Sequence, residues 1–385
     1  MGASDLKNGE RTGREACPTA LFRSFWQAGF ECSTHVLKTG KRLDLVASTQ
    51  HDVLIEKDYE RCKKLGILTA REGFRWHRIE ARRGRYDFSS ARGMVEAAER
   101  QGIQVIWDLL HFGWPDHLQV FDASFVDAFG EFASETGRLL KRETSGPALV
   151  APVNEISFLS WAGGDKAYLN PFEIGRGGEL KRQLVRAYLC AAQAIRAELP
   201  DARLVSPEPV IHIVGDPQRP DDVKQAEEYR LSMFEAWDMI SGRSQPELGG
   251  DERYLDVIGI NYYDRNQWWN YGKTIRRHEA EYRPLSEILA EVYIRYRRPM
   301  FIAETGTEDL ERPGWMAYVA NEVQVSREQG VPLHGICIYP ILNHPGWDDD
   351  RHCHNGLWDY ARPDGTREIY QPLALELERL MTYRK

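Results

Sequence analysis

The sequence predicts an α/β fold, a single (β/α)8 TIM barrel with long loops on its C-terminal face. Strand-like apolar runs alternate with longer helix-like runs eight times along the 385 residues, which is the signature of such a barrel. Several runs are continuously apolar, such as Val-Ile-Gly-Ile at 257–260, as in strands that are buried on both faces of a parallel sheet. A doubly wound open sheet would usually carry a glycine-rich phosphate loop after an early strand, and no such loop is visible.

The predicted elements follow one another in order. Eight strands are expected at Ser24–Glu31, Glu72–Trp76, Gln104–Leu109, Leu149–Asn154, Arg203–Ser206, Leu255–Asn261, Met300–Glu304 and Gly335–Tyr339. Eight helices are expected at Asp52–Leu65, Ser90–Gln101, Phe125–Arg142, Leu180–Leu199, Val223–Ile240, Leu285–Tyr296, Trp315–Glu328 and Tyr370–Met381. The second helix, for example, opens at a serine cap and stops before Gly102. We therefore expect a polar tail over residues 1–20 and one barrel domain over 21–385.

Composition excludes several classes of protein. With 58 acidic and 50 basic side chains the formal net charge is -8, so the chain has no general attraction for nucleic acid or for an anionic membrane surface. No apolar run is long enough to span a bilayer. The six cysteines form no CxxC pair, which argues against a zinc ribbon or a disulfide framework. The polar N-terminus lacks the apolar segment of a signal peptide, so we expect a cytoplasmic protein.

Two carboxylates stand at the ends of predicted strands, where such a barrel carries its active site. Glu155 directly follows the fourth strand and Glu304 ends the seventh. Each would lose hydration there unless it is paired or used, and for either one alone an ion pair with a neighbouring arginine is the structural alternative. The fourth and seventh strands lie across the barrel mouth from each other. Two acids so placed can protonate a glycosidic oxygen and attack an anomeric carbon.

Six short blocks along the chain have a common order and spacing. They are Phe25-Trp26-Gln27-Ala28-Gly29-Phe30, Phe74-Arg75-Trp76-His77-Arg78-Ile79, Asp108-Leu109-Leu110-His111, Pro152-Val153-Asn154-Glu155-Ile156, Gly259-Ile260-Asn261-Tyr262-Tyr263 and Ile302-Ala303-Glu304-Thr305-Gly306. Over residues 25–380 the chain thereby resembles glycoside hydrolase family 1 and, more broadly, the clan of retaining (β/α)8 glycosidases.

The resemblance implies a role for each matching residue. Glu304 would be the nucleophile and Glu155 the acid/base, with their carboxyl groups about 5–5.5 Å apart as in retaining enzymes. Arg75 would hold Glu304 ionised, and Tyr263 would donate a hydrogen bond to it. The remaining matches are expected to contact the sugar, and they are His111, Asn154 and Asn261. No cofactor is expected, and the expected partner is a small carbohydrate or glycoside.

The chain departs from the family where the family grips a glucose-like ring. The end of the first strand reads Glu31-Cys32-Ser33-Thr34-His35 and lacks the family's glutamine. After the eighth strand, Asn343-His344-Pro345-Gly346-Trp347 has glycine where the family has glutamate. The candidate specificity residues are therefore Glu31, Asn343 and Trp347, the last as a platform under the sugar. Trp161, six residues beyond Glu155, is a further candidate for substrate contact, with packing onto the barrel rim as the alternative. The proline that follows the family's acid/base is replaced by Ile156.

These observations favour a retaining exo-β-glycosidase that acts on a small soluble β-glycoside with altered sugar specificity. A transglycosidase of the same clan would use the same two acids. A non-catalytic sugar-binding barrel would keep the fold but would gain nothing from two opposed buried acids. A metal-dependent hydrolase rests only on the His- and Asp-rich segment 344–354, which has no recognised ligand spacing.

Overall fold

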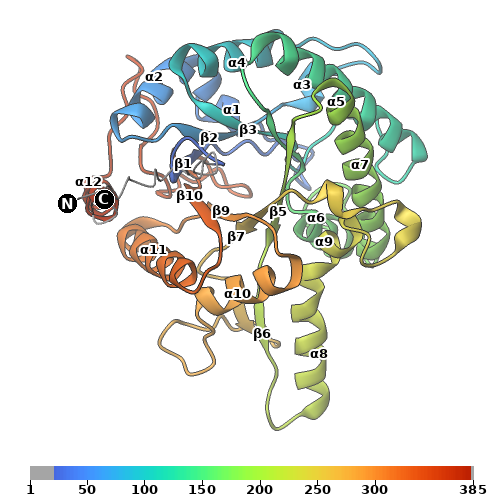
Figure 1. Ribbon diagram of the computed structural model, residues 1–385, viewed down its shortest axis with the longest axis vertical. Helices are drawn as coiled ribbons and strands as arrows, with labels where there is room; N and C mark the ends of the chain where they lie inside the picture. The colour runs from blue at the N-terminus through green and yellow to red at the C-terminus, as the bar shows by residue number, and fades with distance from the viewer. Residues whose placement is uncertain (1–20, 383–385) are drawn as a thin grey trace, which may run out of the picture.

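The computed structural model describes residues 21–382; the predicted tail, residues 1–20, lies outside the described residues. It confirms the predicted barrel (Figure 1). Eight parallel strands close in the order β1-β10-β9-β7-β5-β4-β3-β2. These strands are β1 (Trp26–Gly29), β2 (Thr69–Gly73), β3 (Gln104–Leu110), β4 (Leu149–Val153), β5 (Arg203–Pro209), β7 (Val257–Asn261), β9 (Met300–Thr305) and β10 (Leu333–Ile338).

Helices surround the barrel and bury one face against it. The long ones are α2 (His51–Lys64), α4 (Ser89–Gln101), α5 (Ala123–Glu143), α7 (Gly177–Glu198), α8 (Pro220–Leu231), α10 (Leu285–Tyr296), α11 (Arg312–Glu328) and α12 (Gln371–Thr382). Shorter ones are α1 (Leu45–Ser48), α3 (Trp76–Ile79), α6 (Ile156–Leu159) and α9 (Glu235–Ile240). Among residues 21–382, no helix combines the length and the hydropathy needed to cross a bilayer.

The apolar core has two parts. The larger part lies between the strands and the surrounding helices. A smaller cluster fills the barrel interior with side chains such as Ile106, Val205 and Phe301, and Phe22 packs against Phe301 with ring centroids 4.8 Å apart. Since these apolar side chains occupy part of the interior, the polar residues inside the barrel gather toward the C-terminal ends of the strands, where the predicted site lies.

Most predicted bounds differ from the structure by a few residues, and two predicted elements differ in a way that matters for the site or the fold. The second strand was expected at Glu72–Trp76 but runs from Thr69 to Gly73. This strand carries Arg71 and Glu72, which point to opposite sides of the barrel wall and remove the apolar pattern on which the prediction depended. The predicted helix Val223–Ile240 is divided into α8 and α9 by a turn of 3-10 helix at Ser232–Phe234.

A small accessory sheet, β6 (His212–Val214) paired with β8 (Gln267–Trp269), forms with α8 an arm that extends away from the barrel (Figure 1). Trp268 packs against Tyr229 of α8, and Trp269 stacks on Tyr271. The tryptophan pair therefore packs within the arm.

Candidate active site

A cavity of about 630 Å³ lies at the C-terminal ends of the barrel strands, within the size range of small-molecule sites. Six of the residues predicted from the sequence line it, namely Glu31, His111, Glu155, Tyr263, Glu304 and Trp347. Asn154 and Asn261 are fully buried next to the two acids. Trp161 and Asn343, also predicted to contact substrate, do not belong to the cavity wall.

Glu304 lies near the end of β9 and is held by two donors. Nη1 of Arg71 donates to its Oε1 over 2.7 Å, and the hydroxyl of Tyr263 donates to its Oε2 over 2.8 Å. Burial and the charge of Glu304 raise the pKa of Tyr263 well above its ordinary value, so the phenol keeps its proton and acts as a donor. A charge-assisted bond on one oxygen and a phenol on the other favour the ionised carboxylate.

The predicted contact between Arg75 and Glu304 is wrong. Arg75 follows β2 at the start of α3, where its guanidinium pairs with Asp44 at 3.2 Å and Asp52 at 2.8 Å. Arg71, four residues earlier and within β2, makes the contact with Glu304 instead. The error follows from the misplaced second strand, because a shift of three residues along the chain exchanges which arginine lies inside the barrel.

Glu155 lies two residues beyond the end of β4 and has a very different environment. Its Oε1 accepts from Nδ2 of Asn261 over 2.8 Å, and no salt bridge reaches it among the described residues. Burial first, and then the negative charge of Glu304, raise the pKa of Glu155 well above its usual range. The surroundings of Glu155 therefore favour its protonated form, whereas Glu304 is held by two hydrogen-bond donors.

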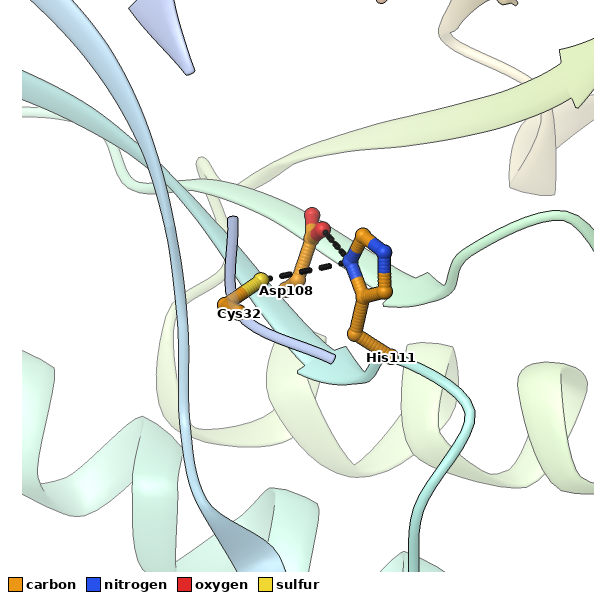
Figure 2. A group of neighbouring side chains, drawn as sticks. All are labelled: Cys32, Asp108 and His111. Carbon is orange, nitrogen blue, oxygen red and sulfur yellow. Dashed lines mark hydrogen bonds and ion pairs between the residues drawn. The ribbon is translucent and has the colours of Figure 1, made fainter. Parts of the chain in front are cut away.

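Cys32, Asp108 and His111 form a compact buried group that has metal-ligand types (Figure 2). Nδ1 of His111 lies 2.9 Å from Asp108 Oδ2 and 3.2 Å from Cys32 Sγ. Both oxygens of Asp108, however, already accept from Arg71, whose guanidinium would repel a cation there. Burial and Asp108 also raise the pKa of the Cys32 thiol, which disfavours the thiolate that metals require. These residues do not fit a metal.

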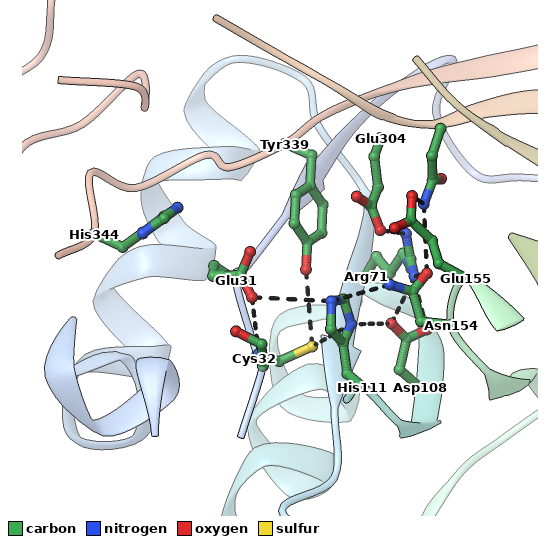
Figure 3. A network of polar contacts seen from close by, with 12 residues as sticks. Glu31, Cys32, Arg71, Asp108, His111, Asn154, Glu155, Glu304, Tyr339 and His344 are labelled. Atoms are coloured by element: carbon green, nitrogen blue, oxygen red, sulfur yellow. Dashed lines mark hydrogen bonds and ion pairs between the residues drawn. The ribbon is translucent and has the colours of Figure 1, made fainter. Parts of the chain in front are cut away.

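Asp108 and His111 also belong to a ring of polar contacts with Arg71 and Asn154, next to the two acids (Figure 3). Arg71 donates from Nη2 to Oδ1 of Asn154 over 2.6 Å, which leaves Nδ2 of Asn154 to donate to Nε2 of His111 over 3.1 Å. His111 in turn reaches Asp108 through Nδ1, and Asp108 returns to Arg71. Both ring nitrogens of His111 thus have protein partners, so its predicted bond to a sugar hydroxyl stays a prediction.

Part of the cavity wall consists of side chains that lie outside this ring of contacts and are suited to binding a substrate. Glu31, 7% exposed, accepts the N–H of Ser33 on Oε1 over 2.8 Å, while Oε2 has no described hydrogen-bond partner. Trp347 packs edge-on against Phe112 with ring centroids 5.7 Å apart, and Phe158 lies beside both rings. A carboxylate beside aromatic faces suits a ring that carries hydroxyl groups.

The two remaining predicted residues have structural partners. Asn343 donates to Asp359 over 2.9 Å and accepts from the backbone of Gly356 over 2.7 Å, so it fixes the loop that follows β10. Trp161 packs against Phe158 and Tyr168. Within residues 21–382, segment 344–354 contributes no cluster of ligand atoms close enough to hold a metal.

The sequence does not predict the role of Arg71, and for Glu208 it leaves open a substrate contact, a supporting contact or a purely structural role. Arg71 is fully buried and uses all five of its N–H groups, two on Asp108 and the others on Glu304, Asn154 and the Ala303 carbonyl. A lone arginine within a short polar stretch gives no sequence signal for this. The predicted fifth strand ended before Glu208, whereas β5 includes it.

Comparisons with known proteins found one family match and several structures with the same fold. Residues 47–108, which include Arg71 and Asp108, match the family model Glyco_hydro_42, described as beta-galactosidase. No curated protein matches the sequence. The fold matches the family 1 β-glucosidase from Thermotoga maritima at a TM-score of 0.75 and 16% identity, over 93% of this chain and 97% of that one.

Two further structures have the same fold. A hyperthermophilic β-glucosidase mutant matches at a TM-score of 0.73 and 15% identity, over 94% of this chain and 100% of the other. The AHE enzyme from Alicyclobacillus herbarius matches at 0.74 and 18%, over 88% of each chain. The barrel and the shared fold confirm the predicted (β/α)8 architecture, and the match of residues 47–108 to a glycoside hydrolase family model agrees with the predicted resemblance.

Proposed function

We propose that the protein is a retaining exo-β-glycosidase, with Glu304 as nucleophile and Glu155 as acid/base. The observation that carries the proposal is the difference between the hydrogen-bond donors around the two acids, which both line the cavity. Glu304 receives a guanidinium and a phenol, whereas Glu155 is buried with only an amide donor. Double displacement requires one group that attacks as a carboxylate and one that donates a proton, and these two environments suit those two roles.

The reaction would proceed in two balanced steps. The carboxylate of Glu304 attacks the anomeric carbon while Glu155 transfers its proton to the leaving oxygen, and the aglycone departs as an alcohol. Glu155, now ionised, then takes a proton from water as that water attacks the anomeric carbon and displaces Glu304. The second displacement restores the original configuration and returns both acids to their starting states.

The sugar specificity is expected to differ from that of a glucosidase. Acidic residues outnumber the arginines in the wall of the cavity: the acids are Glu31, Glu155, Asp264, Glu304, Glu308 and Asp309, and the arginines are Arg265 and Arg351, of which Arg351 is paired with Glu308. An anionic glycone would be repelled by this wall, so we propose a neutral glycone whose hydroxyl groups donate to Glu31. The β-glucosidase from Thermotoga maritima has been crystallised with the sugar-like inhibitor deoxynojirimycin, and a cavity of this kind suits a small glycoside as partner. We also propose that the protein is located in the cytoplasm.

The test is a screen of aryl β-glycosides against the wild type, Glu304→Gln and Glu155→Ala. The matched control is Glu322→Gln, because Glu322 is also buried and accepts a backbone N–H, that of Ser286 on the helix side of the barrel. We expect Glu304→Gln to lose at least 1,000-fold in kcat, on the order found when one member of a catalytic unit is removed. Full turnover by Glu304→Gln would refute the assignment.

A time course of the released sugar by NMR then decides the stereochemistry. Retention of the anomeric configuration supports double displacement, whereas inversion would exclude it. Adding an alcohol to the same reaction separates hydrolysis from transglycosylation, since a transglycosidase forms the alkyl glycoside in preference to free sugar. Binding of a glycoside without turnover by the wild type would favour the non-catalytic barrel.

A further inference from the structure

The backbone of the acid/base residue is held in an unfavourable conformation. Glu155 has φ +47° and ψ +61°, which is the left-handed region that costs a residue with a side chain about 1–2 kcal/mol. Such a conformation persists only where its surroundings impose it. The direction in which the carboxyl group of Glu155 leaves the chain depends on this turn.

Three consecutive N–H groups of the turn are bound to β5. The N–H of Glu155 donates to the carbonyl of Pro207 over 3.0 Å. The N–H of Ile156 donates to Oε1 of Glu208 over 2.6 Å, and the N–H of Ser157 donates to Oε2 of Glu208 over 3.0 Å. One side chain therefore binds two adjacent backbone groups immediately after the acid/base.

Among residues 21–382, the Glu208 side chain has no other hydrogen-bond partner that would explain its burial. It is 1% exposed and does not belong to the cavity wall, so it cannot contact substrate directly. Burial raises its pKa to about 7 even though the two N–H groups and Lys181 oppose this shift. Lys181 is itself ion-paired with Glu235. Burying a carboxylate costs desolvation free energy. Because both oxygens of Glu208 bind the same turn, its burial indicates a role at that turn.

We propose that Glu208 is a positioning residue that holds the acid/base turn and thereby aims Glu155 at the leaving oxygen. The inference rests on the proposed function, since it assigns Glu208 to the step in which Glu155 donates its proton. Family 1 enzymes have proline after the acid/base, and proline carries no N–H. Ile156 does carry one, and Glu208 receives it, so this chain fixes the turn by a contact from β5.

Glu208→Gln tests this contact with almost no change of volume. An amide has one oxygen, so the –NH2 group faces one of the two backbone N–H donors and leaves it without an acceptor. The turn should then relax and Glu155 should lose its alignment with the leaving oxygen. Nucleophilic attack by Glu304 should be spared, because Glu208 contacts neither Glu304 nor its donors.

The experiment compares kcat/KM for two β-glycosides of the same sugar, one with a dinitrophenyl leaving group and one with an unactivated phenyl group. The first departs without a proton and the second requires one, so their ratio isolates acid catalysis. We expect Glu208→Gln to lower kcat/KM for the phenyl glycoside 10- to 100-fold, and to change that for the dinitrophenyl glycoside less than about threefold. Glu322→Gln should leave both unchanged.

Equal losses on both substrates, or no loss on either, would overturn the role of Glu208 while Glu304→Gln remained inactive. Activity of Glu304→Gln on both would instead overturn the proposed function, and the Glu208 inference with it. If Glu208→Gln does not fold, Glu208→Asp replaces it. Aspartate keeps the charge but is one methylene too short to reach both N–H groups, so the same selective loss is expected and an unchanged ratio would refute the proposal.

Discussion

Replacing Arg71 by lysine gives the sharpest test of how the site is built. Arg71 uses five N–H groups on four acceptor residues, and an ammonium offers at most three donors without the planar fork. At least two charge-assisted bonds are lost, each about 1.5–3 kcal/mol. The total of about 3–6 kcal/mol is divided between the folded state and the transition state. We expect kcat/KM to fall about 100-fold, equivalent to about 2.7 kcal/mol, and the free energy of unfolding to fall by about 1–3 kcal/mol.

Arg75→Lys is the matched control for this substitution. Arg75 is also buried and also pairs with two carboxylates, Asp44 and Asp52, but neither belongs to the cavity wall. Both variants would be assayed on one aryl β-glycoside and unfolded in urea. Arg75→Lys should keep kcat/KM within about threefold. If the two variants lost kcat/KM equally, or if Arg71→Lys kept full activity, the assignment of Arg71 to the nucleophile would be refuted.

Three further predictions follow from the same contacts. Tyr263→Phe removes the 2.8 Å bond to Glu304 and should lower kcat about 10-fold in steady-state assays; an unchanged kcat would exclude a role for the hydroxyl. The alkaline limb of kcat/KM should reflect loss of the Glu155 proton and should lie well above pH 5, because burial and Glu304 raise this pKa; a limb at pH 4–5 would contradict that. Burial lowers the pKa of His51, but two buried carboxylates raise it to about 9, so its stabilisation is complete below about pH 6.5 and is lost as pH rises through 9. Urea unfolding should show a loss of up to about 3 kcal/mol over that window, and His51→Gln should abolish this dependence.

The sequence predicted the barrel and its two acids because both depend on local patterns. Apolar runs bounded by helices locate a strand to within a few residues, and a carboxylate next to such a run must lie at its end. β4, which ends two residues before Glu155, and β9, which carries Glu304, are apolar along almost their whole length, so their ends were easy to recognise. The sequence therefore located the residues of the candidate site best where the strand was most hydrophobic.

Prediction failed where the barrel wall itself carries charge. β2 reads Thr-Ala-Arg-Glu-Gly, with Arg71 directed inward and Glu72 directed outward to His51 and Tyr59 of α2. Each charge is satisfied by partners far away in the chain, such as Asp108 and Glu304 for Arg71. No local pattern encodes those partners, so the strand could not be distinguished from a loop. The apolar residues that follow it in the sequence were predicted as the strand instead.

The position of that one arginine explains how a single cavity can give the two acids such different surroundings. Arg71 reaches Glu304 through Nη1, while its other terminal nitrogen is occupied by Asp108 and Asn154. Its charge is therefore largely neutralised toward Glu155, for which burial and the neighbouring carboxylates dominate. Removing Asp108 would leave the guanidinium charge uncompensated and lower the pKa of Glu155, so a smaller fraction of Glu155 would carry the proton at a given pH. Asp108→Asn should accordingly move the alkaline limb of kcat/KM to lower pH, and an unmoved limb would show that Asp108 serves only to fix Arg71 in place.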